Sequence, residues 1–402
     1  MPHRRLNFFF LNIGHLYDHL FVLIFATVAA LSLSKNWGLT YDELIPYATP
    51  GFVAFGVCAL PAGWLADKWS RQGMMVVFFI GIGVSSIATS FAQTPLQIGL
   101  GLLIIGVFAA IYHPVGLALV VEGRERTGVP LAINGIFGNL GVAAAALITG
   151  LLIDIIDWRA AFYVPGVLSI GSGLAYGFFI RSNSNHEVPA QMKKTAGKTD
   201  IDAASAEDRK IIIRIFAIMF ISTAIGGVIY QSTTFALPKL FDERLIDIAE
   251  TASEIGFYAF IVFAVAGIAQ LVVGYFADRH SIRSVFGSVA LLQICFLALV
   301  HNMSGLNSVL VAMIVMMAVF GQIPINDILV GRISSPEWRS RIFAFRYIIT
   351  FSAMATTLPL VAWVHANWGF GTLFLALAAA AIVTLISVLM LPRTGRITGK
   401  PS

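Results

Sequence analysis

The sequence contains few charged residues and few cysteines. Asp, Glu, Lys and Arg make up 12% of its 402 residues, whereas a soluble domain carries about 25%. Its two cysteines, Cys58 and Cys295, lie far apart in apolar stretches, which excludes a disulfide framework. The sequence contains no phosphate-binding loop, nucleophile motif or long polar domain, so we expect neither an enzyme nor a cofactor. The low charge indicates a protein that sits in lipid.

Long hydrophobic runs take up most of the chain, and hydrophobic residues make up 58% of it. A transmembrane helix needs about 20 mostly apolar residues. On that basis the chain is predicted to be an all-α membrane protein with twelve spans: 7–33, 44–66, 73–92, 96–121, 129–153, 160–180, 211–237, 253–277, 285–300, 307–331, 343–363 and 370–391.

Basic residues predict how these spans are oriented. If both termini are cytoplasmic, about 22 of the 26 Lys and Arg residues face the cytoplasm, as the positive-inside rule requires. Acidic residues such as Asp42 and Asp154 fall on the opposite side. We therefore expect a multi-pass protein of the bacterial inner membrane. The same bias accounts for the net charge of +5 without a nucleic-acid partner.

Two halves of the chain repeat each other. The segment GWLADKWSR, with Asp67, and the segment GYFADRHSIR, with Asp278, lie 211 residues apart. Two further pairs lie 210 residues apart, namely Pro114 with Pro324 and Trp158 with Trp368. Internal repeats of this kind are typical of transporters. They predict a six-helix bundle in 1–181, a polar cytoplasmic linker in 182–210 and a second bundle in 211–402.

The first of these segments resembles the signature loop of the major facilitator superfamily, with Gly63, Asp67, Lys68 and Arg71 in the expected places. This resemblance covers essentially the whole chain. It implies a secondary transporter with two six-helix bundles around a cavity that works by alternating access on a small-molecule substrate. We expect the protein to be a monomer.

Other segments resemble the fosmidomycin-resistance group of drug exporters: GHLYDHLF (14–21), IYHP (111–114), GRERTG (123–128) and GIFGNLG (135–141). This resemblance implies a proton-coupled antiporter for the efflux of a small amphiphilic or anionic compound. That group places its acid one residue later than Asp18, where this chain has His19. Which of the two residues takes the acid position is open.

Ionisable residues in the first span lie on one helical stripe: His15, Asp18 and His19. His113 in the fourth span lies at a similar depth, so the four are candidates for proton coupling, with protons as the coupling ion. They could instead form a polar cluster that only holds the two spans together. A third reading is a transition-metal site, because His15 and His19 are spaced i, i+4. The protein would then carry a metal or a metal chelate.

Six polar residues are candidates for substrate binding because they lie within spans expected to line the cavity: Asn12, Tyr112, Tyr230, Gln231, Gln322 and Asn326.

Charged residues near the cytoplasmic ends of spans are candidates for a gate: Asp67, Lys68, Arg71, Asp278, Arg279, Arg283, Asp327 and Arg346. A carboxylate at such an end can accept hydrogen bonds from the N-terminus of a neighbouring helix. We expect Asp67 to do so at the span 343–363 and Asp278 at the span 129–153. Asp327 is expected to pair with Arg346. Alternatively, the charged residues of these loops have no gate role and only contribute to the bias of basic residues toward the cytoplasm.

Overall fold

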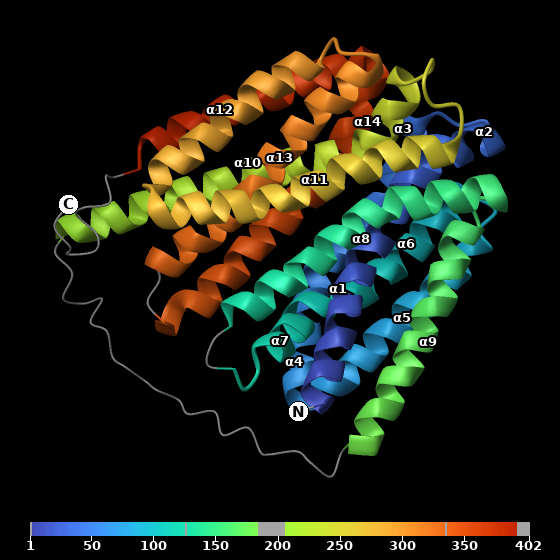
Figure 1. Ribbon diagram of the computed structural model, residues 1–402, viewed down its shortest axis with the longest axis horizontal. Helices are drawn as coiled ribbons and strands as arrows, with labels where there is room; N and C mark the ends of the chain where they lie inside the picture. Colours follow the sequence, from blue (N-terminus) through green and yellow to red (C-terminus); the bar gives the residue numbers. More distant parts are fainter. Residues whose placement is uncertain (1, 125–126, 184–205, 334–335, 392–402) are drawn as a thin grey trace. The chain divides into compact units, whose positions relative to one another are not determined.

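The computed structural model of the chain describes residues 2–124, 127–183, 206–333 and 336–391 (Figure 1). Within these ranges the backbone is helical apart from short turns. Eleven of the described helices are long and apolar enough to cross a membrane. These findings agree with an all-α membrane protein.

The described chain divides into two compact units. The first holds α1 to α9 together with Phe235–Ala264 and Leu358–Trp363, and the second holds the rest. The predicted bundle boundaries stay a prediction. Residues 184–205, most of the predicted linker, lie outside the described residues.

Nine α-helices and three short segments of other helical types build the main part of the first unit. They are α1 (Pro2–Val28), η1 (Ala29–Leu33), α2 (Ser34–Trp37), α3 (Tyr41–Leu44), η2 (Ile45–Ala48), α4 (Thr49–Lys68), α5 (Arg71–Ser90), α6 (Pro95–Ala109), η3 (Tyr112–Gly116), α7 (Leu117–Val121), α8 (Gly128–Ile155) and α9 (Ala160–Asn183). Local sequence sets several of the starts. At α5 the Ser70 hydroxyl accepts a hydrogen bond from the Gly73 N–H at 3.0 Å, which is the usual role of an N-cap serine.

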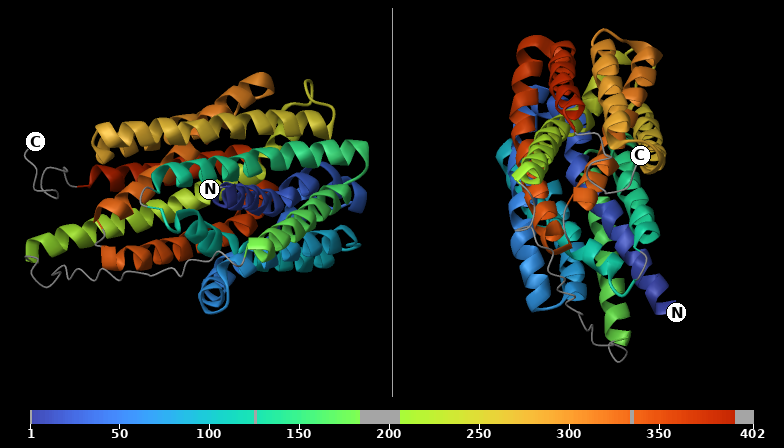
Figure 2. Two further views of the ribbon diagram at one scale, coloured as in Figure 1. Left: turned by 60° about the horizontal axis from the view of Figure 1, so that its bottom comes forward. Right: turned by 90° about the vertical axis from the view of Figure 1, so that its left-hand side faces the viewer.

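Three helix pairs run side by side in this unit: α1 with α8, α5 with α9, and α4 with α6 (Figure 1 and Figure 2). The approach of α1 and α8 depends on Gly141. A Cβ atom at this position would lie 2.2 Å from the backbone oxygen of Leu16. Small residues allow backbones to approach in this way in membrane helices. The contact fixes α1, which carries most of the candidate site, against α8.

The fourth predicted span changes its helical type near its middle. The α-helix α6 ends at Ala109, and a π-helical segment, η3, follows from Tyr112 to Gly116. Pro114 lies inside η3 and has no N–H to donate, so it cannot continue the regular α-helical ladder. In α13 (Gly305–Ile333), by contrast, the helix runs through Pro324. The two prolines of the repeat therefore have different local structures.

The second unit is built from the remaining long helices. They are α10 (Ala206–Arg244), α11 (Ala252–Arg279) and α14 (Pro336–Leu389), each shared with the first unit, and α12 (Ile282–Val300) and α13. Helices α12 and α13 lie side by side (Figure 1). Their contact includes the buried apolar residues Phe286, Val289 and Ala318.

The last two predicted spans lie within one element, α14. Its apolar part, Ile348–Leu389, has 42 residues. At about 1.5 Å per residue it would be about twice as long as the hydrocarbon core is thick. The helix is interrupted at Gly369, whose φ of 73° and ψ of 176° are not helical. Glycine adopts this positive φ without steric cost.

Candidate functional site

The middle of α1 carries a group of buried polar side chains that faces η3. His15 and Asp18 are 7% and 0% exposed. Asp18 follows Arg4, the first residue of the span, by 14 residues and precedes Trp37, the last, by 19. Together with His19 and His113, these residues form what we call the histidine cluster. An ionisable group this deep in a span costs about 2.5–3.5 kcal/mol or more, so its presence requires a partner or a function.

The ring of His15 is held in one orientation by α8. Its Nδ1 atom lies 2.8 Å from the backbone oxygen of Asn134, in a buried contact. Because a carbonyl oxygen only accepts, Nδ1 carries the proton and donates it. The other nitrogen, Nε2, then carries a lone pair. Among the described residues Nε2 is buried and has no hydrogen-bond partner.

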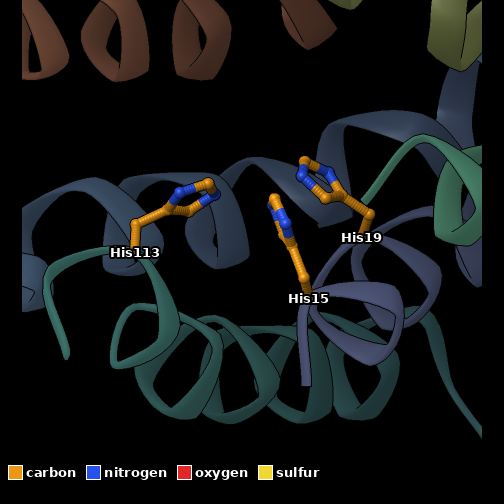
Figure 3. Close-up of side chains that lie close together, drawn as sticks. All are labelled: His15, His19 and His113. Atoms are coloured by element: carbon orange, nitrogen blue, oxygen red, sulfur yellow. The ribbon is translucent and has the colours of Figure 1, made fainter. Parts of the chain in front are cut away.

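Asp18 lies against the fourth span. Its Oδ2 atom is 3.3 Å from Nε2 of His113. His113 lies in η3, and its ring points toward the rings of His15 and His19 (Figure 3). Since a carboxylate accepts, the arrangement orients Nε2 of His113 as the donor toward Asp18.

The three imidazole rings point toward one space (Figure 3). The ring centroids are 5.0 Å apart for His15 and His19, 5.5 Å for His15 and His113, and 5.7 Å for His19 and His113. One ring nitrogen from each lies within 4.8 Å of the others. The sequence predicted that His15 and His113 could converge. Whether the four residues carry protons stays a prediction.

A hydrogen-bonded network surrounds the cluster. The Tyr112 hydroxyl donates to the backbone oxygen of Leu11 at 2.7 Å, and Tyr112 stacks on His15 with centroids 4.8 Å apart. The Asn134 amide donates to Oδ1 of Asn12 at 2.9 Å. Two candidates for substrate binding, Asn12 and Tyr112, are thus engaged in fixing α1 to its neighbours.

The other four substrate candidates lie in α10 and α13. Tyr230 packs against Phe320, with centroids 5.4 Å apart. Gln322 is bonded on both sides: its Oε1 accepts from Gln293 at 2.9 Å, and its Nε2 donates to the Ser222 backbone oxygen at 3.1 Å. Gln231 and Asn326 are buried, and each has one amide atom without a hydrogen-bond partner among the described residues.

The gate candidates have mostly local contacts. Asp67 forms an ion pair with Arg71 at 2.8 Å, and Arg71 also contacts Glu122 at 3.4 Å. The Arg279 guanidinium lies over the Tyr275 ring at 3.5 Å, and Arg283 donates to the Leu391 backbone oxygen at 3.3 Å.

Four further gate candidates complete this set. Lys68 and Asp278 are exposed at the ends of α4 and α11. Asp327 forms an ion pair with Arg346, a buried residue in α14. The gate roles of all eight residues stay a prediction.

The sequence of the chain matches the model of a known protein family. The model described as Major Facilitator Superfamily matches residues 11–248 and 219–402. The chain belongs to the major facilitator superfamily. It is therefore a transporter and not an enzyme, as the sequence predicted.

Two curated members of the superfamily are similar in sequence. The 4-hydroxybenzoate transporter PcaK of Pseudomonas putida is 24% identical over 398 residues, covering 90% of this chain and 86% of PcaK. The probable sulfoacetate transporter SauU of Cupriavidus necator is 24% identical over 236 residues, covering 56% of this chain and 55% of SauU. This second match spans only about half of either protein.

A solved structure of the superfamily has the same fold. It is a bacterial homolog of the human lysosomal transporter Spinster, in an inward-facing and unoccupied conformation. The TM-score is 0.72 at 15% identity, over 97% of this chain and 95% of that chain. At this identity the likeness shows the fold alone.

Two residues of the polar networks were missed by the sequence prediction. Asn134 is fully buried between α1 and η3, and Gln293 is fully buried between α12 and α13. Each is an uncharged amide in a largely apolar predicted span. Their presence inside predicted spans was the available signal, because polar side chains there tend to face other helices.

Proposed function

We propose that this superfamily member carries a small organic anion across the bacterial inner membrane. The observation that carries the proposal is the histidine cluster, which places several polar groups at the centre of a span. Such groups persist in membranes where they bind a substrate or an ion. Imidazole, amide and phenol groups supply N–H and O–H donors, which are what carboxylate and sulfonate oxygens need.

The printed names of two relatives support this substrate class. Sulfoacetate and 4-hydroxybenzoate are both small organic anions. An anion beside Asp18 also needs a positive charge nearby, because two negative charges in a span repel strongly. The sequence predicts protons as the coupling ion, and its resemblance to the fosmidomycin-resistance group predicts outward transport.

A transport assay tests the proposal. The purified protein is reconstituted into proteoliposomes, and uptake of labelled sulfoacetate and 4-hydroxybenzoate is measured with and without an imposed pH gradient. We expect saturable uptake that an excess of unlabelled anion abolishes, and a response to the pH gradient if protons are coupled. A panel in which only cationic or neutral compounds are transported would contradict the proposal.

A matched pair of variants controls this assay. His15→Ala removes a ring of the cluster and should abolish specific uptake. His280→Ala changes an exposed histidine at the end of α11 and should leave uptake unchanged.

We also propose that the chain crosses the membrane twelve times with both termini in the cytoplasm. The length of α14 and its break at Gly369 support two crossings there. Fusions of alkaline phosphatase after Asn367 and after Leu391 test this topology. Activity at the first position and not at the second is expected, and equal activity would contradict it.

A further inference from the structure

The histidine cluster has the donor set of a metal site. His15, His19 and His113 each offer one nitrogen, and these three atoms lie within 4.8 Å of one another. Their rings converge on one space (Figure 3). Imidazole nitrogen is a preferred ligand of zinc and of several other divalent transition metals. A small shift of the side chains would bring all three within ligand distance of a single ion.

The contacts behind the rings favour the same interpretation. A histidine that binds a metal usually donates its other N–H to a carbonyl or a carboxylate, which fixes the tautomer. His15 does this through Nδ1, which lies 2.8 Å from the Asn134 backbone oxygen. Asp18 lies beside His113, with Oδ2 3.3 Å from Nε2 of that ring.

One ring nitrogen of the cluster has no other use. Nε2 of His15 is a buried atom without a hydrogen-bond partner among the described residues. A lone pair buried without a partner costs free energy in a cluster that serves packing alone. Gly138 provides the room next to it, because a Cβ atom there would lie 2.7 Å from Nε2.

Charge is consistent with a divalent cation. The Asp18 side chain is fully buried, and a buried carboxylate requires a compensating positive charge. A divalent ion on three neutral imidazoles beside one carboxylate leaves a net charge of about +1 by simple addition of formal charges. Three protein ligands also leave a fourth coordination position open.

We propose that His15, His19 and His113 bind one divalent transition-metal ion of the zinc class. Asp18 and the Asn134 carbonyl act as positioning groups behind the ligands. The proposal concerns metal binding by the purified protein, so it stands or fails independently of the transport of organic anions.

Zinc titration of the purified protein tests the site. The protein carries a streptavidin-binding tag, since a polyhistidine tag would itself bind zinc, and it is first stripped with a chelator. Isothermal titration should give one zinc ion per chain. Titration with Co²⁺ should give the visible absorption bands of a site with nitrogen ligands and low coordination number.

Substitutions of the ligands should weaken binding strongly. Partners behind the ligands are worth about 10–100-fold in affinity, so His15→Ala, His19→Ala and His113→Ala should each cost more than about 100-fold. Asp18→Asn should cost about 10–100-fold and keep the Co²⁺ bands, because it changes a positioning group and no ligand. His280→Ala should bind as the parent does.

Two glycine variants on α8 keep the test decisive if a histidine variant fails to fold. Gly138→Ala leaves every histidine in place but puts a methyl group against Nε2 of His15, so it should abolish zinc binding. Gly135→Ala is its control, because nothing lies within 4 Å of a Cβ atom at that position. Absence of stoichiometric zinc binding in the parent, or equal affinity in the parent and in Gly138→Ala, would overturn the proposal.

Discussion

At the scale of single residues, Asn134 supports the histidine cluster through two different groups. Its backbone oxygen lies 2.8 Å from Nδ1 of His15, and its side chain donates to Oδ1 of Asn12 at 2.9 Å. A substitution of the side chain removes this second contact and the 2.9 Å hydrogen bond to the Tyr112 hydroxyl, and it leaves the backbone oxygen in place. The two roles can therefore be separated by experiment.

We predict that Asn134→Ala lowers stability without removing the metal site. Side-chain hydrogen bonds between membrane helices are worth about 0.6 kcal/mol on average and at most about 1.7 kcal/mol. A loss of about 1–2 kcal/mol should appear as a lower melting temperature in detergent. Zinc affinity should change little, because the carbonyl that orients His15 is retained.

Asn12→Ala provides the partner for a double-mutant cycle. If the two amides interact, the double variant should lose less stability than the sum of the single variants. Strict additivity would show that the contact contributes nothing.

The sequence could predict the cluster only in part at this scale. His15, Asp18 and His19 stand out because ionisable residues are rare in spans, and Pro114 marked the neighbourhood of His113. Asn134 and Gln293 carry no charge and form no pattern along the chain. Their role depends on which residue of another helix they meet, and this is fixed by tertiary packing.

At the scale of elements, the packing of α1 on α8 depends on Gly141. We predict that Gly141→Ala destabilises the protein by about 1–3 kcal/mol, the usual cost of excess volume in a packed interior. The added methyl group would meet the Leu16 backbone oxygen, 2.2 Å from the ideal Cβ position, and a backbone cannot rotate away as a side chain can. Thermal melting in detergent measures the effect.

Gly135→Ala on the same helix is the comparison. It meets nothing within 4 Å, and alanine favours a helix by about 1 kcal/mol over glycine. Its melting temperature should equal or exceed that of the parent. Equal melting of both glycine variants would show that α1 and α8 can separate without cost.

The loop after α4 permits a test of the predicted gate. Asp67 and Glu122 both contact Arg71, and exposed ion pairs contribute only about 0–1 kcal/mol to stability. Asp67→Asn should therefore melt like the parent, lose most of its turnover and keep its substrate affinity. Glu122→Gln removes the other contact of Arg71 and should retain turnover. Equal loss in both variants would assign the effect to Arg71 and not to a gate.

Sequence patterns predicted the positions of the spans better than the irregular segments within and between them. The predicted spans fall in the helical parts of the described chain, because about 20 apolar residues in a row leave few alternatives in a membrane. The π-helical segment Tyr112–Gly116 and the joining of the last two spans in α14 were not predicted. Such details depend on how neighbouring helices compete for the same backbone groups.

At the scale of the whole molecule, the proposed metal and the proposed substrate have complementary charges. An ion held by three neutral histidines beside Asp18 leaves a net charge of about +1, which a singly charged organic anion would neutralise. The following prediction rests on both proposals.

We predict that chelator treatment of proteoliposomes lowers the uptake of organic anions and that zinc restores it. A loss of only about 1.4 kcal/mol of anion-binding free energy would lower the affinity for the anion about tenfold. His280→Ala should respond like the parent. Uptake that is unaffected by the chelator, in protein shown to bind zinc, would separate the metal from the transported substrate.

The π-helical segment η3 makes the function of this chain sensitive to residue count. An α-helix turns by about 100° per residue, and a π-helical turn accommodates one residue more than an α-helical turn. Deleting one residue between Val115 and Val121 would rotate the following residues of α7 about the helix axis, so that their side chains would face different neighbours. No side chain of the cluster would be altered. Single-codon deletions in this stretch should therefore inactivate the protein where most conservative substitutions are tolerated.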